Sequence, residues 1–301
     1  MSTEAFSLPS VTSGQAPARI VVGVYLRSLR KSQGMTLPGA ARALAVTKSA
    51  LSRWEHAQSP IDPRTLRLLL HLYGVAPQHI RYLLSQTPPQ RHTRGKTAGI
   101  GEHDPFDQWP DAACLEAWAR YVAVMHTAGE VLQYAPVRFP PGVRTEAYSR
   151  AVLDQVWSPQ DEPGAQMPGW VHTVTKVATR RTVLVDEALL QRPIGGPEVA
   201  AAQLRHVLRL VRSPQADAPR ILVLPVVRAY AFADLPDAAE VTVHGHRMVT
   251  GAGLTPFYGT GPAADVIATG LRDAAARACG QEESCARIER AADAMDRRTA
   301  S

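Results

Sequence analysis

One short stretch of the chain combines hydroxyl and basic side chains at the spacing of a single helix face. The residues that would project outward from such a helix and its cap are Thr47, Lys48, Ser49, Ser52 and Arg53. A guanidinium can read a guanine edge or hold a phosphate, and ammonium and hydroxyl groups bind phosphates. We therefore expect Arg53 to contact a base or a phosphate of DNA and Lys48 to contact a phosphate. A merely solvated basic face is the alternative.

The helix that carries these side chains has a clear beginning and a short helical neighbour. Thr47 is a favourable N-cap for a helix over residues 48–56, and Thr36 caps a short preceding helix that carries Arg42. Residues 45–46 make the turn between them. Two short helices joined in this way match the helix-turn-helix geometry, in which the second helix enters the major groove. Thr36 and Arg42 therefore complete the set of candidate DNA contacts.

Caps and apolar periodicity predict a compact all-α domain over residues 19–86. Its five helices are expected over residues 20–33, directly after Thr36, over 48–56, over 64–72 after Asp62-Pro63, and from Pro77 onward. Helices this short bury one apolar face each, so they must pack together to be stable. The sequence thus predicts a five-helix DNA-binding domain.

This domain resembles the Cro/repressor-like (XRE-type) family of helix-turn-helix regulators over residues 19–76. The matching residues are 26–30, Met35, Thr36, Ala41, Leu44 and the run 46–55. The resemblance implies specific binding to double-stranded DNA, usually as a homodimer on a two-fold operator. It also implies a structural ion pair of Glu55 with Arg27 or Arg30.

The sequence departs from the pattern of that family in two places. Leu37-Pro38 stands where a polar DNA contact is common, so one usual contact is missing. Ala45 stands where the family prefers glycine, at a cost of ~1 kcal/mol if its φ is positive. We expect the fold to survive this cost.

All of the positive charge excess lies in the first third of the chain. Residues 1–100 hold 13 Lys and Arg against three Asp and Glu, whereas the rest holds 20 against 24. A segment this basic is attracted to a polyanion such as nucleic acid. No apolar stretch reaches the ~18 residues of a membrane span and no secretory signal is visible, so we expect a cytoplasmic protein without membrane contact. Three cysteines without a CxxC pair argue against a disulfide scaffold.

The remaining sequence predicts a flexible arm over residues 1–18, a linker over 87–108 and a second domain over 109–297. Helices are expected from Leu115, over 146–157, over 197–211, over 262–279 and over 281–297; strands are expected over 182–185, 221–227 and 240–249. The fold class is therefore an all-α helix-turn-helix domain followed by a mixed α+β C-terminal domain.

The second domain resembles the sensor-like domain of the actinobacterial Scr1-type, antitoxin-like regulators, which include WhiJ-like proteins. The matching blocks are residues 141–152, 186–190, 192–199, 203–204, 223–225 and 282–284. The segment 164–181 departs from the Arg-rich helix of that group. The resemblance implies transcriptional control, often with a small acidic protein as partner, and no catalysis.

Features that could instead indicate an enzyme are weak. His244 and His246 could bind a metal only with a third ligand, so an exposed pair in a hairpin is the preferred interpretation. The glycines at 251–253 and 259–261 match no phosphate-binding pattern, and the adjacent Asp186 and Glu187 would point apart on a strand. We therefore expect no catalytic, metal or cofactor site.

The leading hypothesis is a sequence-specific transcriptional regulator whose second domain senses a small molecule or a protein partner. An antitoxin-like protein that binds mainly a protein, with DNA binding for autoregulation, is the alternative, and a DNA-targeted enzyme is a third, weaker one. The operator, the effector, the direction of regulation and any role of His244 and His246 do not follow from the sequence.

Overall fold

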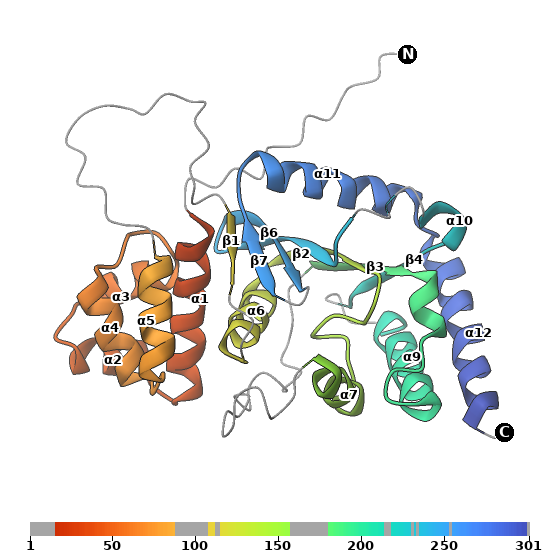
Figure 1. Cartoon of the computed structure of the whole chain (residues 1–301), viewed down its shortest axis with the longest axis horizontal. Coiled ribbons are helices and arrows are strands. Elements are labelled where there is room, and N and C mark those ends of the chain that lie inside the picture. The colour runs from red at the N-terminus through yellow and green to blue at the C-terminus, as the bar shows by residue number, and fades with distance from the viewer. Residues whose placement is uncertain are drawn as a thin grey trace, which may run out of the picture.

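The computed structural model describes residues 16–87, 108–111, 115–156, 180–213, 218–229, 232, 235–252 and 255–299. As predicted, an all-α N-terminal domain precedes a C-terminal domain in which helices pack on a sheet (Figure 1). Most of the expected arm and linker lies outside the described residues.

Five helices form the N-terminal domain, in the order expected from their caps. They are α1 (Pro17–Ser32), α2 (Leu37–Ala43), α3 (Lys48–Glu55), α4 (Pro63–Leu72) and α5 (Pro77–Gln86). The first helix begins at Pro17, three residues before the expected start at residue 20. Pro17 and Ala18 are both buried.

A single seven-stranded sheet organises the C-terminal domain, with strand order β1-β7-β6-β5-β2-β3-β4. The strands are β1 (Gln108–Pro110), β2 (Glu130–Ala135), β3 (Arg180–Asp186), β4 (Arg220–Leu224), β5 (Ala238–Val243), β6 (His246–Ala252) and β7 (Pro256–Gly259). β2, β3 and β4 are parallel, and every other pairing is antiparallel. The sheet is therefore mixed.

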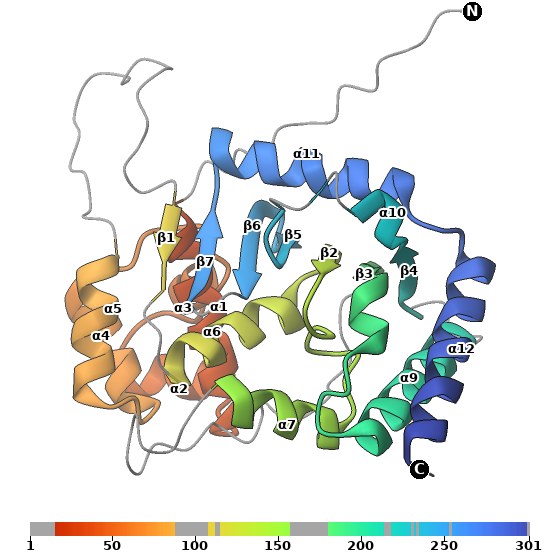
Figure 2. The same ribbon diagram turned by 45° about the vertical axis from the view of Figure 1, so that its right-hand side comes forward.

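Helices cover both faces of this sheet. α11 (Pro262–Arg277) lies along one face, and α6 (Leu115–Thr127), α7 (Glu146–Val156) and α9 (Pro197–Val211) lie on the other, as Figures 1 and 2 show. α12 (Gln281–Thr299) packs along α9. The short α10 (Val226–Ala229) and a 3-10 turn η1 (Glu187–Gln191) complete the described elements.

β4 is the last strand of the sheet, and the start of α12 covers its outer edge. The buried Ser284 Oγ accepts a hydrogen bond of 2.9 Å from the Val223 N–H, and the Cys279 N–H donates to the Val223 carbonyl at 2.8 Å. An unpaired edge strand invites pairing with another chain, and these bonds block it.

Two of the predicted strands were wrong in extent. The segment expected as one strand over 240–249 is a hairpin, because His244 (φ 51°) and Gly245 (φ 82°) form a two-residue turn between β5 and β6. Positive φ at both central residues is the geometry of a type I′ turn. The strand expected over 221–227 ends at Leu224 and continues as α10.

The helix-turn-helix domain shares a continuous hydrophobic core with the sheet domain. α1 packs against α6, and its residues are buried around most of the helix circumference. At the same junction Arg120 of α6 forms a two-bond ion pair with Asp111, both fully buried, and its guanidinium lies over the rings of Tyr25 and Tyr82. The two domains are therefore joined by packing as well as by the chain.

No helix among the described residues is long and apolar enough to cross a membrane.

Candidate nucleic-acid interface

The two helices of the helix-turn-helix begin at threonine caps. Thr36 Oγ1 accepts a hydrogen bond of 3.1 Å from the Gly39 N–H, and Thr47 Oγ1 accepts one of 3.0 Å from the Ala50 N–H. Ala45 in the intervening turn has φ 52°, the left-handed conformation for which glycine is preferred. Local sequence thus sets both helix starts, and the turn carries a small backbone strain.

The structure places the predicted DNA-contacting side chains on one outward surface of α2 and α3. Those that are exposed are Thr36, Arg42, Thr47, Lys48, Ser49 and Arg53, while Ser52 is half-buried. Arg42, Lys48 and Arg53 give this surface three positive charges and no negative one. It can therefore donate hydrogen bonds to phosphates and to base edges.

The opposite side of α3 is fixed to the core. Leu51 is fully buried, and Trp54 packs partly buried against the same cluster. Gly23 lets α1 pack closely against α3, because a Cβ atom at this position would lie 2.6 Å from the Trp54 carbonyl oxygen. The outward surface is therefore carried on a rigidly seated helix.

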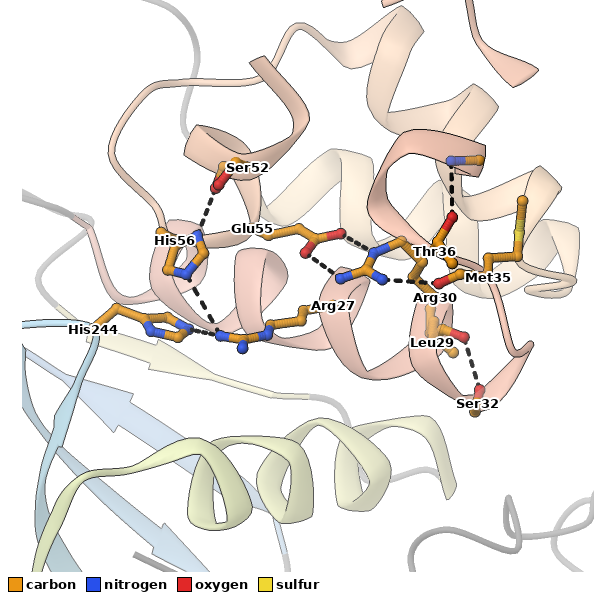
Figure 3. Close-up of polar contacts among 11 residues, drawn as sticks. Arg27, Leu29, Arg30, Ser32, Met35, Thr36, Ser52, Glu55, His56 and His244 are labelled. Carbon is orange, nitrogen blue, oxygen red and sulfur yellow. Dashed lines mark hydrogen bonds and ion pairs between the residues drawn. The ribbon is translucent and has the colours of Figure 1, made fainter. Parts of the chain in front are cut away.

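A buried ion pair ties the end of α3 to α1. Arg30 Nε and Nη2 donate to the two Glu55 oxygens at 2.6 and 2.9 Å, and Arg30 Nη1 donates to the Met35 carbonyl at 2.8 Å (Figure 3). The hydrogen bonds that Arg30 donates to Glu55 raise the pKa of Arg30. Of the two partners expected for Glu55, Arg30 takes the position and Arg27 does not.

Arg27 instead joins two histidines from different domains. Its Nη1 lies 3.5 Å from His56 Nε2 and 3.3 Å from His244 Nε2, and the two rings are 4.3 Å apart (Figure 3). His246 Nε2 reaches the His56 carbonyl at 3.3 Å. A guanidinium can only donate hydrogen bonds, so each Nε2 atom that faces Arg27 is the acceptor in its contact.

This cluster of Arg27, His56, His244 and His246, called the histidine latch below, corrects one expectation. The hairpin is present, but its histidines are half-buried against α1 and the end of α3 instead of exposed. Burial, followed by the nearby His56 and Arg27, lowers the pKa of His244 to about 4. Among the described residues no group of three or more His, Cys, Asp or Glu is placed to hold a metal ion.

A polar groove lies on the sheet directly beside this hairpin. Its volume is about 460 Å³, within the usual range for small-molecule sites. It is lined by Glu130, Val131, Leu132, Arg180, Thr182, Glu240, Thr242 and Arg247. Thr242 and Arg247 are cross-strand neighbours just before the turn that carries His244. One wall of the groove is therefore the hairpin whose tip contacts α1 and the C-terminal end of α3.

The other conspicuous residues of the C-terminal sequence have structural contacts. Asp186 caps η1 and accepts a hydrogen bond of 2.9 Å from the Tyr134 hydroxyl, while Glu187 binds Arg287 and the Val226 N–H. Gly261, with φ 83°, caps α11. These contacts hold neighbouring elements together.

Comparison with known proteins assigns both parts of the chain. Residues 118–290 match a family described as a domain of unknown function (DUF5753), and residues 21–83 match a helix-turn-helix domain. Searches of curated proteins and of solved structures gave no match. The helix-turn-helix match includes all the candidate DNA contacts, and it supports a DNA-binding regulator of the expected kind.

Proposed function

We propose that this chain, a member of the DUF5753 family, is a sequence-specific transcriptional regulator. A helix-turn-helix domain precedes the DUF5753 domain in the chain. The observation that carries the proposal is the outward surface of α3, where Lys48, Ser49 and Arg53 are exposed on a helix with its other side fixed. α3 enters the major groove and α2 lies across the backbone.

The proposed roles follow the chemistry of each side chain. Arg53 reads a guanine edge with two hydrogen bonds, and Arg42 and Lys48 hold phosphates. Thr36 and Thr47 use their oxygens to cap the helices, which leaves each hydroxyl hydrogen able to donate to a phosphate. Binding of this kind derives most of its affinity from charge and its specificity from α3.

The chain is proposed to bind its operator as a homodimer. Helix-turn-helix dimers place two recognition helices one turn of DNA apart, so the operator would be a two-fold repeat. The resemblance to XRE-type regulators supports this arrangement.

The C-terminal domain is proposed to receive the regulatory signal, from a small molecule or a protein partner such as a small acidic protein. Two observations support it: the histidine latch touches the end of α3, and the groove shares its hairpin. A ligand that moved this hairpin would change the contacts of His244 with Arg27 and His56. The role is one of binding, without catalysis.

Fluorescence anisotropy tests the proposal. The purified protein is titrated against a duplex from upstream of its own gene and against a random duplex of equal length, over a salt series. The proposal expects the upstream duplex to bind ~10³-fold tighter or more at physiological salt. Equal, steeply salt-dependent binding to both duplexes would contradict it and would favour a protein partner.

A further inference from the structure

The buried arginines of the described residues fall into two kinds. Arg30 donates two hydrogen bonds to the Glu55 carboxylate, and Arg120 donates two to the Asp111 carboxylate. Arg144 and Arg181 are 7% and 4% exposed, but their hydrogen bonds within the described residues reach only main-chain carbonyls. This second kind has no compensating charge in direct contact.

Arg181 has donors that nothing in the described residues accepts. It lies on β3, on the opposite side of the strand from the exposed Arg180, and its Nη1 donates to the Pro141 carbonyl at 2.6 Å. Its Nε and Nη2 are buried and have no hydrogen-bond partner. Arg144 is near enough to act on its charge, and burial together with Arg144 lowers the pKa of Arg181 to about 10. Burying an unpaired charge is costly, so this arrangement calls for an acceptor.

Arg138 adds a further positive charge near Arg144. Arg138 and Arg144 lie on the segment between β2 and α7, and the carboxylate that faces them is Asp237, 3.9 Å from Arg138. Burial raises the pKa of Asp237 to about 6, so it is ionised at neutral pH. The described part of the chain therefore places one carboxylate near Arg138 and Arg144.

The segment that carries Arg144 is held in place. Gln203 of α9 accepts from the Thr145 N–H at 2.7 Å and donates to the Val143 carbonyl at 2.7 Å. Burial raises the pKa of Tyr121 of α6 and both Arg144 and Arg181 act to lower it, so the two guanidiniums lie near the same ring. Donors that are held in place favour recognition of a planar or tetrahedral oxyanion.

We infer that Arg181 and Arg144 bind a small oxyanion, a phosphate or a carboxylate, inside the C-terminal domain. Its oxygens accept from the Arg181 Nε and Nη2 groups, which have the fork geometry that matches both anions. This site lies on the opposite face of the sheet from the groove and does not depend on DNA binding. The ligand of this site is a free anion or the anionic group of a larger molecule.

The test uses thermal unfolding of the full-length protein in phosphate, in acetate and in chloride at equal ionic strength. The variants are Arg181→Met and Arg180→Met, which remove the same charge from adjacent residues on opposite sides of β3. Phosphate also stabilises proteins through exclusion from their surface, and the rise in Tm that remains in Arg181→Met gives that background. At about 100 times the dissociation constant, the bound anion should raise Tm by roughly 5 °C.

The inference expects this rise in the wild type and in Arg180→Met, and its loss in Arg181→Met. The anion that gives the rise identifies the ligand as phosphate-like or carboxylate-like. Isothermal titration of the wild type with phosphate and with acetate keeps the test decisive if Arg181→Met does not fold. No rise and no heat with either anion would overturn the inference.

The chain's own carboxylates are the competing source of negative charge. Asp161 and Glu162 lie outside the described residues and precede β3. A double variant, D161N with E162Q, separates the two sources. An anion-dependent rise in Tm that is also seen in this variant supports the inference. A rise in Tm that appears only in this variant overturns it, because a carboxylate of the chain itself would then occupy the site in the native protein.

Discussion

Removal of the Asp111 carboxylate should destabilise both domains of the molecule together. Asp111 and Arg120 are fully buried, and they meet through hydrogen bonds of 2.7 and 2.8 Å. The same guanidinium lies 5.6 Å from the Tyr25 ring of α1 and 5.7 Å from the Tyr82 ring of α5. Asp111→Asn keeps the shape of the side chain but leaves Arg120 as an unpaired charge at the domain junction.

The expected loss follows from that burial. Breaking one side of a buried ion pair costs about 3–5 kcal/mol in the free energy of unfolding. At roughly 2–4 °C per kcal/mol, Tm should fall by about 6–20 °C. The exposed pair Arg212 and Glu289 provides the control, because Glu289→Gln makes the same chemical change and should cost about 0–1 kcal/mol.

The assay is urea unfolding followed by far-ultraviolet circular dichroism and by tryptophan fluorescence. The circular dichroism signal reports on the helices of both domains together. Trp54 lies in α3 and Trp118 in α6, so the fluorescence of single-tryptophan variants reports on each domain separately. We expect both probes to shift together in Asp111→Asn. An Asp111→Asn loss below about 1 kcal/mol, or a shift confined to the C-terminal probe, would refute the argument that the junction is a shared core.

Three further predictions concern α3 and its contacts. Ala45→Gly should stabilise the protein by up to ~1 kcal/mol in urea unfolding because its φ is 52°, and a loss of stability would contradict the strain argument. Gly23→Ala should cost about 1–3 kcal/mol in the same assay, because its Cβ would overlap the Trp54 carbonyl; an unchanged midpoint would show that α1 and α3 are not in close contact. The pKa of His244 is lowered to about 4, so the unfolded state binds more protons and stability should decline as pH falls from about 6.5 towards 4. His244→Asn, which tolerates the positive φ, should reduce that decline in unfolding measured across this pH range, and an identical decline would remove His244 as a contributor.

The sequence was most informative where a local signal decides the structure. Thr36, Thr47 and Asp62 each accept a hydrogen bond from the backbone N–H three residues later, and the helices begin where these caps predicted. Pro197 likewise marks the start of α9, whose bounds match the expected 197–211. A cap depends on a few neighbouring residues, so it can be found without knowledge of the fold.

The strands were less predictable because their signals are shorter. β1, β2 and β7 were not expected; β7 contains Pro256 and Gly259, which usually indicate a turn. The two histidines were expected in a hairpin, but the position of the His244-Gly245 turn was not predicted, because this pair departs from the Asn-Gly and Asp-Gly pairs that usually mark such turns. Pairing partners far apart in the sequence decide these elements.

The contact between the domains was the largest omission. The expected linker implied two separate domains. In the structure, α1 is instead buried on several sides and packs against α6. Its run Ile20, Val21, Val22, Val24 and Tyr25 is apolar around much of the helix, and a helix of that kind is usually covered on every side. This signal was present in the sequence. The histidine latch and the pair of Arg120 with Asp111 follow from that contact and could not be placed without it.

The most direct test of the central proposal, that α3 reads DNA, compares Arg53→Ala with Arg209→Ala. Both remove one exposed arginine, but Arg209 lies on α9 in the C-terminal domain. Fluorescence anisotropy gives the ratio of dissociation constants for the random and upstream duplexes. We predict that Arg53→Ala weakens upstream binding by ~1–3 kcal/mol and lowers this ratio, while Arg209→Ala leaves it unchanged. An unchanged ratio in Arg53→Ala would contradict the account.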